Sequence, residues 1–264
     1  MRGKPWTREE MILAFNLYLK LPFGKINARN SEIIELAQII NRSPSSVALR
    51  LVNYASCDPL LESRGIKGMI GGKKQCQPFW DEFANNREIL FFESECILAE
   101  KQNQTIENKF KSILSEIRDL EGETKIREMK TRINQNVFRQ IVLANYSGKC
   151  AITNIDIPDL LFASHIIPWS INKDERLNPE NGICLSALCD KAFDKGLIGF
   201  NNKLQVVLSP QLKKNSTKEY YTKYFLSLEN IKLTRPQKYS PNLQFLEWHL
   251  DLSLIHISEP TRLL

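Results

Sequence analysis

The segment LLFASHIIPWS, residues 160–170, carries a histidine at the end of an apolar run, with a proline and a tryptophan close behind it. His165 is one of only three histidines in the chain. A neutral imidazole accepts a proton near neutral pH, because its ordinary pKa is about 6.5. His165 is therefore a candidate general base, and a buried structural histidine is the alternative interpretation.

The residues around His165 predict the order strand, loop, strand, helix. The run LLFASHII predicts a strand with His165 near its end, and a polar loop follows. Asn181 stands directly before a second short apolar strand, and residues 187–194 predict a helix. Upstream, residues 136–146 predict a helix and residues 150–153 a short strand or turn. An asparagine before a glycine is also simply a good turn former.

Residues 133 to about 210 resemble an HNH endonuclease domain of the kind found in bacterial restriction-like proteins, which has a ββα-metal architecture. The matching pieces stand in family order: FRQIVLANYSGKCAITN, LLFASHIIPWS, RLNPENGICLSAL and FDKGLIGF. The N-terminal stretch from PWTREE to SSVALRLVNYASCDP resembles the helical region that accompanies this domain in some of those proteins.

The resemblance implies a metal-dependent endonuclease that hydrolyses DNA phosphodiester bonds, with a role in restriction or another defence against foreign DNA. Hydrolysis needs an activated water and a divalent cation that stabilises charge on the phosphate and the leaving oxygen. His165 occupies the first histidine position and would be the general base. Asn181 occupies the central asparagine position, where its amide would hold the loop and orient the histidine. The expected cofactor is Mg²⁺ or Mn²⁺, with Ni²⁺ or Zn²⁺ as further options.

The expected metal ligands depart from the family pattern. Cys189 stands where the family usually has a histidine, and a thiolate is a soft ligand that favours zinc. Asp190 is a hard carboxylate that could substitute, although adjacent helical residues point about 100° apart. Ser164 stands directly before the base, where many HNH enzymes have an acidic or histidine ligand. Asp194 matches a position interpreted as structural, fixing the turn before Gly196.

Two rival interpretations follow from these departures. The first is a catalytically degenerate HNH protein that serves as a DNA-binding module. The second is a zinc-binding or structural unit that uses Cys150, Cys184 and Cys189. The chain has no CxxC pair of the kind zinc sites use, which argues against the second interpretation. His249, in FLEWHL, is interpreted as a packed helical residue.

The N-terminal sequence predicts three short helices. Thr7 and Glu10 have the spacing of a capping box, residues 31–40 are amphipathic, and Ser43 and Pro44 predict the start of a third helix. Such a region resembles a helix-turn-helix bundle. In the third helix, Arg50 and Asn53 are expected on a solvent-facing surface that could contact DNA. The alternative is an ordinary polar helix surface.

The stretch RGIKGMIGGKK, residues 64–74, alternates glycines with cationic side chains. A loop of this kind can bring backbone N–H groups and charges to phosphates. It lacks the spacing of a P-loop, and a flexible basic linker is the alternative. The DNA-contacting candidates here are Arg64, Lys67, Lys73 and Lys74.

The fold class expected is α+β: a mainly helical N-terminal region followed by a C-terminal ββα-metal domain. The expected divisions are a helix-turn-helix-like region at 1–60, a basic loop and helical spacer at 61–130, and the nuclease domain with its extension at 131–252. Residues 78–121 are expected to be helical, and the charged stretch 121–132 is the expected boundary. Residues 253–264 resemble a translated cloning adapter and are expected to be non-native.

Composition agrees with a folded protein that binds a polyanion. Hydrophobic residues make up 42% and charged residues 25%, too balanced for a disordered chain, and the net charge is +6. Six scattered cysteines, without a signal peptide or a long apolar span, predict reduced thiols in a cytoplasmic protein. DNA is the expected partner, a homodimer is a further option, and no membrane association is expected.

Overall fold

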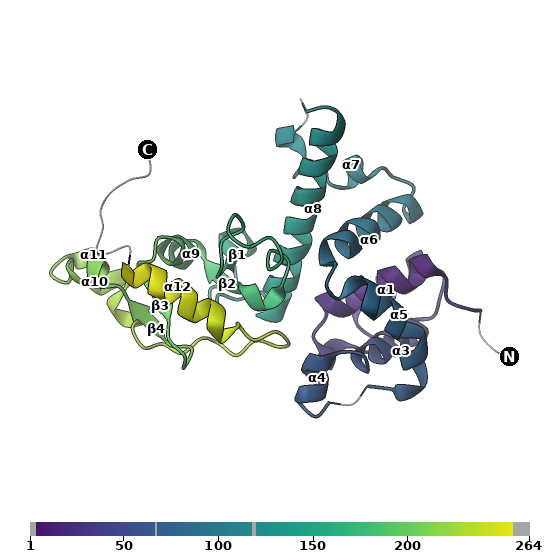
Figure 1. Cartoon of the computed structure of the whole chain (residues 1–264), viewed down its shortest axis with the longest axis horizontal. Helices are drawn as coiled ribbons and strands as arrows, with labels where there is room; N and C mark the ends of the chain where they lie inside the picture. Colours follow the sequence, from purple (N-terminus) through teal and green to yellow (C-terminus); the bar gives the residue numbers. More distant parts are fainter. Residues whose placement is uncertain (1–3, 67, 118–119, 256–264) are drawn as a thin grey trace. The chain divides into compact units, whose positions relative to one another are not determined.

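A computed structural model describes residues 4–66, 68–117 and 120–255 of the chain. The chain divides into two compact units, Met1–Ile141 and Val142–Leu264 (Figure 1). Helices predominate in the first unit, and two small two-stranded sheets lie in the second. The predicted α+β fold class is confirmed.

The first unit consists of helices and short 3₁₀ turns. Its helices are α1 (Arg8–Lys20), α2 (Ser31–Ile39), α3 (Pro44–Ala55), α4 (Pro59–Ser63), α5 (Lys73–Phe83), α6 (Arg87–Lys101), α7 (Ile106–Lys109) and most of α8 (Gly122–Asn145). The 3₁₀ turns are η1 (Phe23–Lys25), η2 (Ile70–Gly72) and η3 (Ser115–Ile117). Helix α1 packs against α2, α3, α5 and α6, so it forms the centre of this unit.

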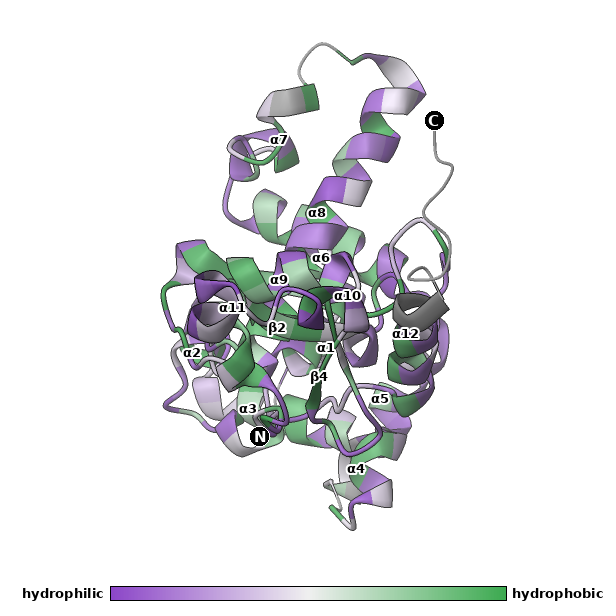
Figure 2. Ribbon diagram, turned by 90° about the vertical axis from the view of Figure 1, so that its left-hand side faces the viewer, coloured by the Kyte–Doolittle hydropathy of each residue, from purple (hydrophilic) through white to green (hydrophobic). Residues whose placement is uncertain are grey.

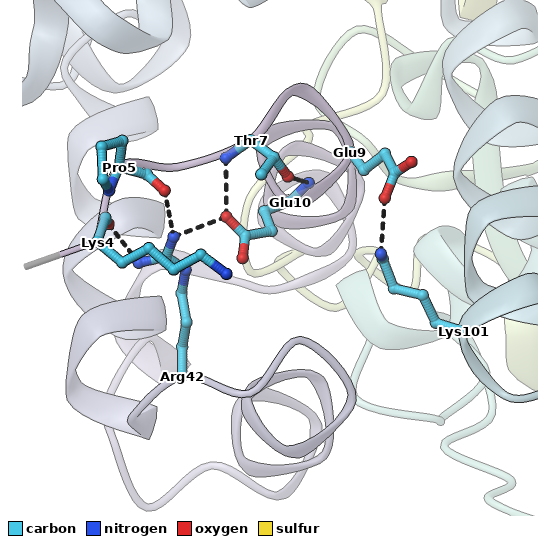
Figure 3. Close-up of polar contacts among 7 residues, drawn as sticks. All are labelled: Lys4, Pro5, Thr7, Glu9, Glu10, Arg42 and Lys101. Atoms are coloured by element: carbon cyan, nitrogen blue, oxygen red, sulfur yellow. Dashed lines mark hydrogen bonds and ion pairs between the residues drawn. The ribbon is translucent and has the colours of Figure 1, made fainter.

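The start of α1 is fixed by the predicted capping box. Thr7 Oγ1 accepts a hydrogen bond from the Glu10 amide at 3.3 Å, and the Thr7 amide donates to Glu10 Oε2 at 2.8 Å. Arg42 donates to the same Glu10 oxygen at 2.7 Å and to the Lys4 and Pro5 carbonyls (Figure 3). Burial raises the pKa of Glu10, but the hydrogen bonds from Arg42 and Thr7 outweigh it and hold that pKa below its ordinary value. The cap therefore ties α1 to Arg42, which lies in the connection between α2 and α3.

The glycine-rich stretch packs on α3, which differs from the flexible linker that was its alternative interpretation. A Cβ at Gly68 would lie 2.3 Å from the Ser56 amide nitrogen, and a Cβ at Gly72 would lie 2.0 Å from Asn53 Cγ. Such distances are shorter than a van der Waals contact, so only glycine permits this approach. These two glycines therefore let the backbone approach α3 closely.

Two helical boundaries differ from those expected. Helix α5 begins at Lys73 and contains Pro78, which was expected to start a helix. A proline there removes one backbone hydrogen bond, and packing of Cys76 and Phe83 in the core compensates. The charged stretch 121–132 is the first half of α8, whose N-terminal half is coloured mainly hydrophilic in Figure 2. Its apolar positions Met129 and Ile133 pack in a separate cluster with Phe110, Leu114 and Ile117.

The second unit holds the strands. After the end of α8 come β1 (Leu161–His165), β2 (Gly182–Ser186), α9 (Ala187–Asp194), β3 (Ile198–Phe200), β4 (Val206–Leu208), α10 (Pro210–Lys213), α11 (Glu219–Tyr224) and α12 (Leu243–Ile255), with the 3₁₀ turns η4 (Pro158–Leu160), η5 (Pro179–Asn181) and η6 (Leu226–Leu228). Strands β1 and β2 are antiparallel, with Leu161 opposite Ser186 and His165 opposite Gly182. Helix α9 packs on β1, β2 and β3, and α12 packs on β3. His165 therefore lies where the β1–β2 pair opens into its connecting loop.

A single buried amide joins the end of α8 to a distant loop of the second unit. Asn145 Nδ2 donates to the Tyr239 carbonyl at 2.8 Å. Its Oδ1 accepts from the Lys238 amide at 2.8 Å and the Tyr239 amide at 3.0 Å. Asn145 is buried, so water cannot replace these bonds if the side chain is removed.

We predict that Asn145→Ala lowers the free energy of unfolding of the second unit by about 3 kcal/mol, because it leaves buried backbone groups without partners. Urea denaturation measures the loss. The control is Asn202→Ala, at an exposed position, with an expected change within about 0.5 kcal/mol. Equal stabilities of the two variants would contradict the assigned role of Asn145.

Candidate active site

His165 lies at the end of β1 with its ring held by the following loop. Its Nε2 lies 2.9 Å from the Arg176 carbonyl oxygen. A carbonyl only accepts hydrogen bonds, so Nε2 carries the hydrogen in the neutral ring and Nδ1 keeps the lone pair. The ring of Trp169 meets that of His165 edge-on, with centroids 5.5 Å apart and planes at 80°. The structure thereby defines which nitrogen of His165 can accept a proton.

The surroundings of His165 favour the neutral ring. Burial lowers the pKa of His165 more strongly than the hydrogen bond to the Arg176 carbonyl raises it, and the pKa lies below its ordinary value. His165 is therefore neutral, and able to act as a base, at neutral pH.

Asn181 pins the loop between β1 and β2. Its Oδ1 accepts from the Ile167 amide at 2.7 Å, and its Nδ2 donates to the Ile167 and Glu175 carbonyls, each at 3.1 Å. Its own carbonyl accepts from the Ile166 amide at 2.9 Å. Asn181 is almost fully buried, at 1% exposure. These contacts join the two sides of the loop, at Ile167 and Glu175, and the sequence predicted that the Asn181 amide holds this loop.

Ser164, the residue directly before His165, contacts Asp190 on α9. The Ser164 hydroxyl donates to Asp190 Oδ1 at 2.5 Å. Ser164 is buried and Asp190 is partly exposed, so the carboxylate is the member of the pair that reaches solvent. The pair joins β1 to α9 through two hard oxygen donors, one of which belongs to the residue directly before His165.

Cys189 differs from the expected metal ligand. It is 2% exposed and interacts with Cys150, which is also buried. The contact with Cys150, together with burial, raises the pKa of the Cys189 thiol, so it stays protonated. Metals bind the thiolate form. The helical rotation between neighbours turns Cys189 into the core, while Asp190 faces Ser164.

The zinc-binding alternative gains no support from the structure. The six cysteines, all within the described residues, form no disulfide, and Cys184 is buried on β2. Among the described residues, no three histidine, cysteine or acidic side chains are grouped to hold a metal ion.

Asp194 does not fix the turn as expected. The residue as a whole is exposed. Partial desolvation of its carboxyl group, together with the neighbouring Asp190, raises the pKa of Asp194. The turn at Gly196 is closed by the backbone, with the Gly196 amide donating to the Phe193 carbonyl at 2.9 Å. Gly196 has a φ of 63°, a conformation that glycine adopts without strain.

His249 is packed in the core, in agreement with its interpretation from the sequence as a packed helical residue. Its ring stacks on Phe193 with centroids 3.8 Å apart, and its Nε2 lies 3.1 Å from the Phe193 carbonyl oxygen. Burial lowers the pKa of His249 to about 4, although the Phe193 carbonyl opposes this. This environment gives the residue a structural role.

The DNA-contacting candidates of the first unit separate into buried and exposed residues. Arg50 and Asn53 were expected on a solvent-facing surface, and that expectation is wrong because α3 is covered by α1, α2, α5 and η2. The Arg50 guanidinium lies over the Trp6 ring at 4.8 Å and donates to Cys76 Sγ at 3.8 Å. The remaining candidates are Arg64, Lys73 and Lys74, which are exposed, and Lys67, which lies outside the described residues.

Two residues of the site carried no clear signal in the sequence. Arg176 supplies the carbonyl that holds His165, and its Nε donates to the Trp169 carbonyl at 2.6 Å. The Arg176 guanidinium also lies 5.0 Å from the centre of the Trp169 ring. In the sequence, Trp169 stands out only by its closeness to His165, and no pattern singles out Arg176.

A β-hairpin and a packed helix, with a neutral histidine at the mouth of the hairpin and a carboxylate on the helix, define a ββα nuclease-like domain. Residues 150–201 match the family described as HNH endonuclease. The match includes His165, Asn181 and Asp190. The family recognition made from the sequence is therefore confirmed.

Two further findings concern similarity to curated proteins and the possibility of a membrane span. No curated protein matches the chain. Within the part of the chain that the structure describes, no helix has both the length and the apolar character needed to cross a membrane.

We predict that Asn181→Asp lowers the free energy of unfolding by about 2–3 kcal/mol, because two buried carbonyls would face an oxygen in place of an amide donor. The matched control is Asn172→Asp in the same loop. Asn172 uses only its Oδ1, which accepts from the Asp174 amide at 3.0 Å, so aspartate keeps that bond. Urea denaturation of both variants tests the prediction, and a loss below about 1 kcal/mol for Asn181→Asp would refute it.

Proposed function

We propose that this protein is a divalent-metal-dependent HNH endonuclease that hydrolyses DNA phosphodiester bonds in the cytoplasm, in restriction or another defence against foreign DNA. The observation that carries the proposal is the neutral His165, held by the Arg176 carbonyl and directly preceded by Ser164 of the Ser164–Asp190 pair. The family match over residues 150–201 supports nuclease chemistry.

His165 is the general base of the proposed reaction. Its Nδ1 lone pair takes a proton from water, and the resulting hydroxide attacks the phosphorus. The opposite P–O bond breaks, and the sugar oxygen that leaves takes up a proton from solvent. The Arg176 carbonyl accepts the Nε2 hydrogen, so it stabilises the imidazolium that forms. Asn181 keeps the loop that carries this carbonyl in place. The protein thereby sets the geometry of the base before substrate arrives.

Asp190 and Ser164 are the residues that would hold the divalent cation. A carboxylate and a hydroxyl suit Mg²⁺ or Mn²⁺, which prefer oxygen ligands, and Mg²⁺ commonly uses one or two carboxylates with waters and substrate phosphates. With Cys189 buried as a neutral thiol, the donor set gives little reason for Zn²⁺ or Ni²⁺. When bound, the cation would offset charge on the phosphate and the leaving oxygen.

A catalytically degenerate DNA-binding module is the second candidate. The observation that favours it is the small donor set, since the described residues contain no group of three metal-ligating side chains. The net charge of +6 suits DNA in either case. Each copy has one proposed base, so cutting both strands in a single event would call for a homodimer.

We predict that the purified protein nicks plasmid DNA with Mg²⁺ or Mn²⁺ and not with EDTA, and that His165→Ala lowers the rate by about 10²–10⁴-fold. His256→Ala, which changes a histidine of the tail, serves as the control. The base must be neutral, and burial lowers the pKa of His165, so the rate should persist as the pH falls to 6.5 and be lost only at lower pH. A gel-based nicking assay across pH measures this. Wild-type protein that binds DNA without metal-dependent cleavage would favour the degenerate module.

We predict that Asp190→Asn weakens Mn²⁺ binding by at least about 10-fold, because it removes the charged ligand. The amide oxygen can still accept the Ser164 hydrogen bond, so the fold should persist. Asp174→Asn, at an exposed position in the loop, is the matched control. Electron paramagnetic resonance of Mn²⁺ gives both affinities, and equal values for the two variants would remove Asp190 from the ligand set.

A further inference from the structure

Arg176 contacts both Trp169 and His165. Its backbone carbonyl lies 2.9 Å from His165 Nε2, and its side-chain Nε donates to the Trp169 carbonyl at 2.6 Å. Its guanidinium lies 5.0 Å from the centre of the Trp169 ring, and the edge of that ring meets His165. The two ends of the loop are therefore joined through one residue that contacts the proposed base.

The contact between Arg176 and Trp169 constrains His165 at a point that Asn181 does not contact. Asn181 bonds the Ile167 and Glu175 backbone, which lies on either side of the Trp169–Arg176 contact. The position of the Arg176 carbonyl then depends on where the rest of that residue is anchored. Its anchor is the Trp169 carbonyl together with the Trp169 ring.

We propose that Arg176 is a positioning residue: its guanidinium, bonded to and stacked on Trp169, holds its own carbonyl where it fixes the hydrogen of His165 on Nε2. This deepens the proposed nuclease function and rests on it. Arginine suits the role because its planar group donates from Nε in its own plane while offering a face to an aromatic ring. The ammonium of lysine cannot meet both demands from one position.

The alternative role for a cation beside a nuclease site is attraction of the DNA phosphate. Arg176 is partly buried, and its Nε and its face are engaged with Trp169. A purely attractive role depends on charge, so lysine would preserve it. A positioning role depends on the fork geometry, so lysine would fail as badly as a neutral side chain.

The experiment compares Arg176→Lys and Arg176→Met with Lys173→Met, which removes an exposed charge from the same loop. The first readout is the imidazole ¹⁵N spectrum of the full chain at pH 8, which reports the tautomer of each histidine without DNA or metal. We expect wild type and Lys173→Met to show His165 as the Nε2–H tautomer, and both Arg176 variants to show a mixture. His249, held by the Phe193 carbonyl, should stay unchanged in every spectrum and reports an intact fold.

The second readout is steady-state cleavage of DNA. We expect kcat to fall by about 100-fold in both Arg176 variants, with KM nearly unchanged, because a misplaced group of this kind lowers the rate of the chemical step. Lys173→Met should retain wild-type kcat. Normal kcat with a raised KM in Arg176→Met, rescued by Arg176→Lys, would overturn positioning in favour of phosphate attraction.

The two readouts separate this inference from the proposed function. A wild-type tautomer for His165 in Arg176→Lys and Arg176→Met, with His249 unchanged, would overturn the positioning role whatever the cleavage result. A mixed tautomer in those variants would support it even in a chain that cleaves no DNA, and the nuclease proposal would then fail alone. If Arg176→Met disturbs the His249 signal, Arg176→Lys decides, because it keeps the charge and most of the side chain.

Discussion

The second unit depends on the satisfaction of backbone groups in the long connection between β1 and β2. A partly buried loop of irregular structure must find hydrogen-bond partners for its N–H and C=O groups, because each one left without a partner costs about 1–3 kcal/mol. The side-chain amide of Asn181 is the hydrogen-bond partner of three of these groups, the Ile167 amide and the Ile167 and Glu175 carbonyls. Because Asn181 directly precedes β2, the same contacts set the register in which β2 meets β1 and bring His165 to the mouth of the hairpin.

Two histidines of one chain acquire different chemistry from their surroundings. His249 stacks on Phe193 and has a pKa of about 4, so its ring serves as a flat, neutral packing group. His165 is only partly buried and is oriented by a carbonyl on one side and a tryptophan edge on the other. Burial lowers the pKa of both rings, but His249 is buried, whereas His165 stays partly exposed at the end of β1. Access and orientation, more than titration, distinguish the proposed base from the structural residue.

The rotation of one helical position decides the chemistry of α9. Cys189 and Asp190 are neighbours in the sequence, and the helix separates their side chains by about 100°. Cys189 turns into the core against Cys150, whereas Asp190 meets Ser164 across to β1. In the proposed function, oxygen ligands therefore take the place of a sulfur ligand, which favours Mg²⁺ or Mn²⁺ over Zn²⁺.

The sequence by itself determined the local elements: the Thr7 capping box, the start of α3 at Pro44, the strand that ends at His165, the second strand after Asn181, and the helix at 187–194. Each rests on interactions within a few residues or on a motif, which a pattern can report. The tertiary structure alone decided that Arg50 and Asn53 are buried, that Asp190 rather than Cys189 faces Ser164, and that Arg176 holds His165. Periodicity gives the faces of a helix relative to one another but not how many neighbours cover them, and α3 is covered on several sides. The carbonyl of Arg176 is a group that every residue possesses, so only the folded path of the chain could assign it a role.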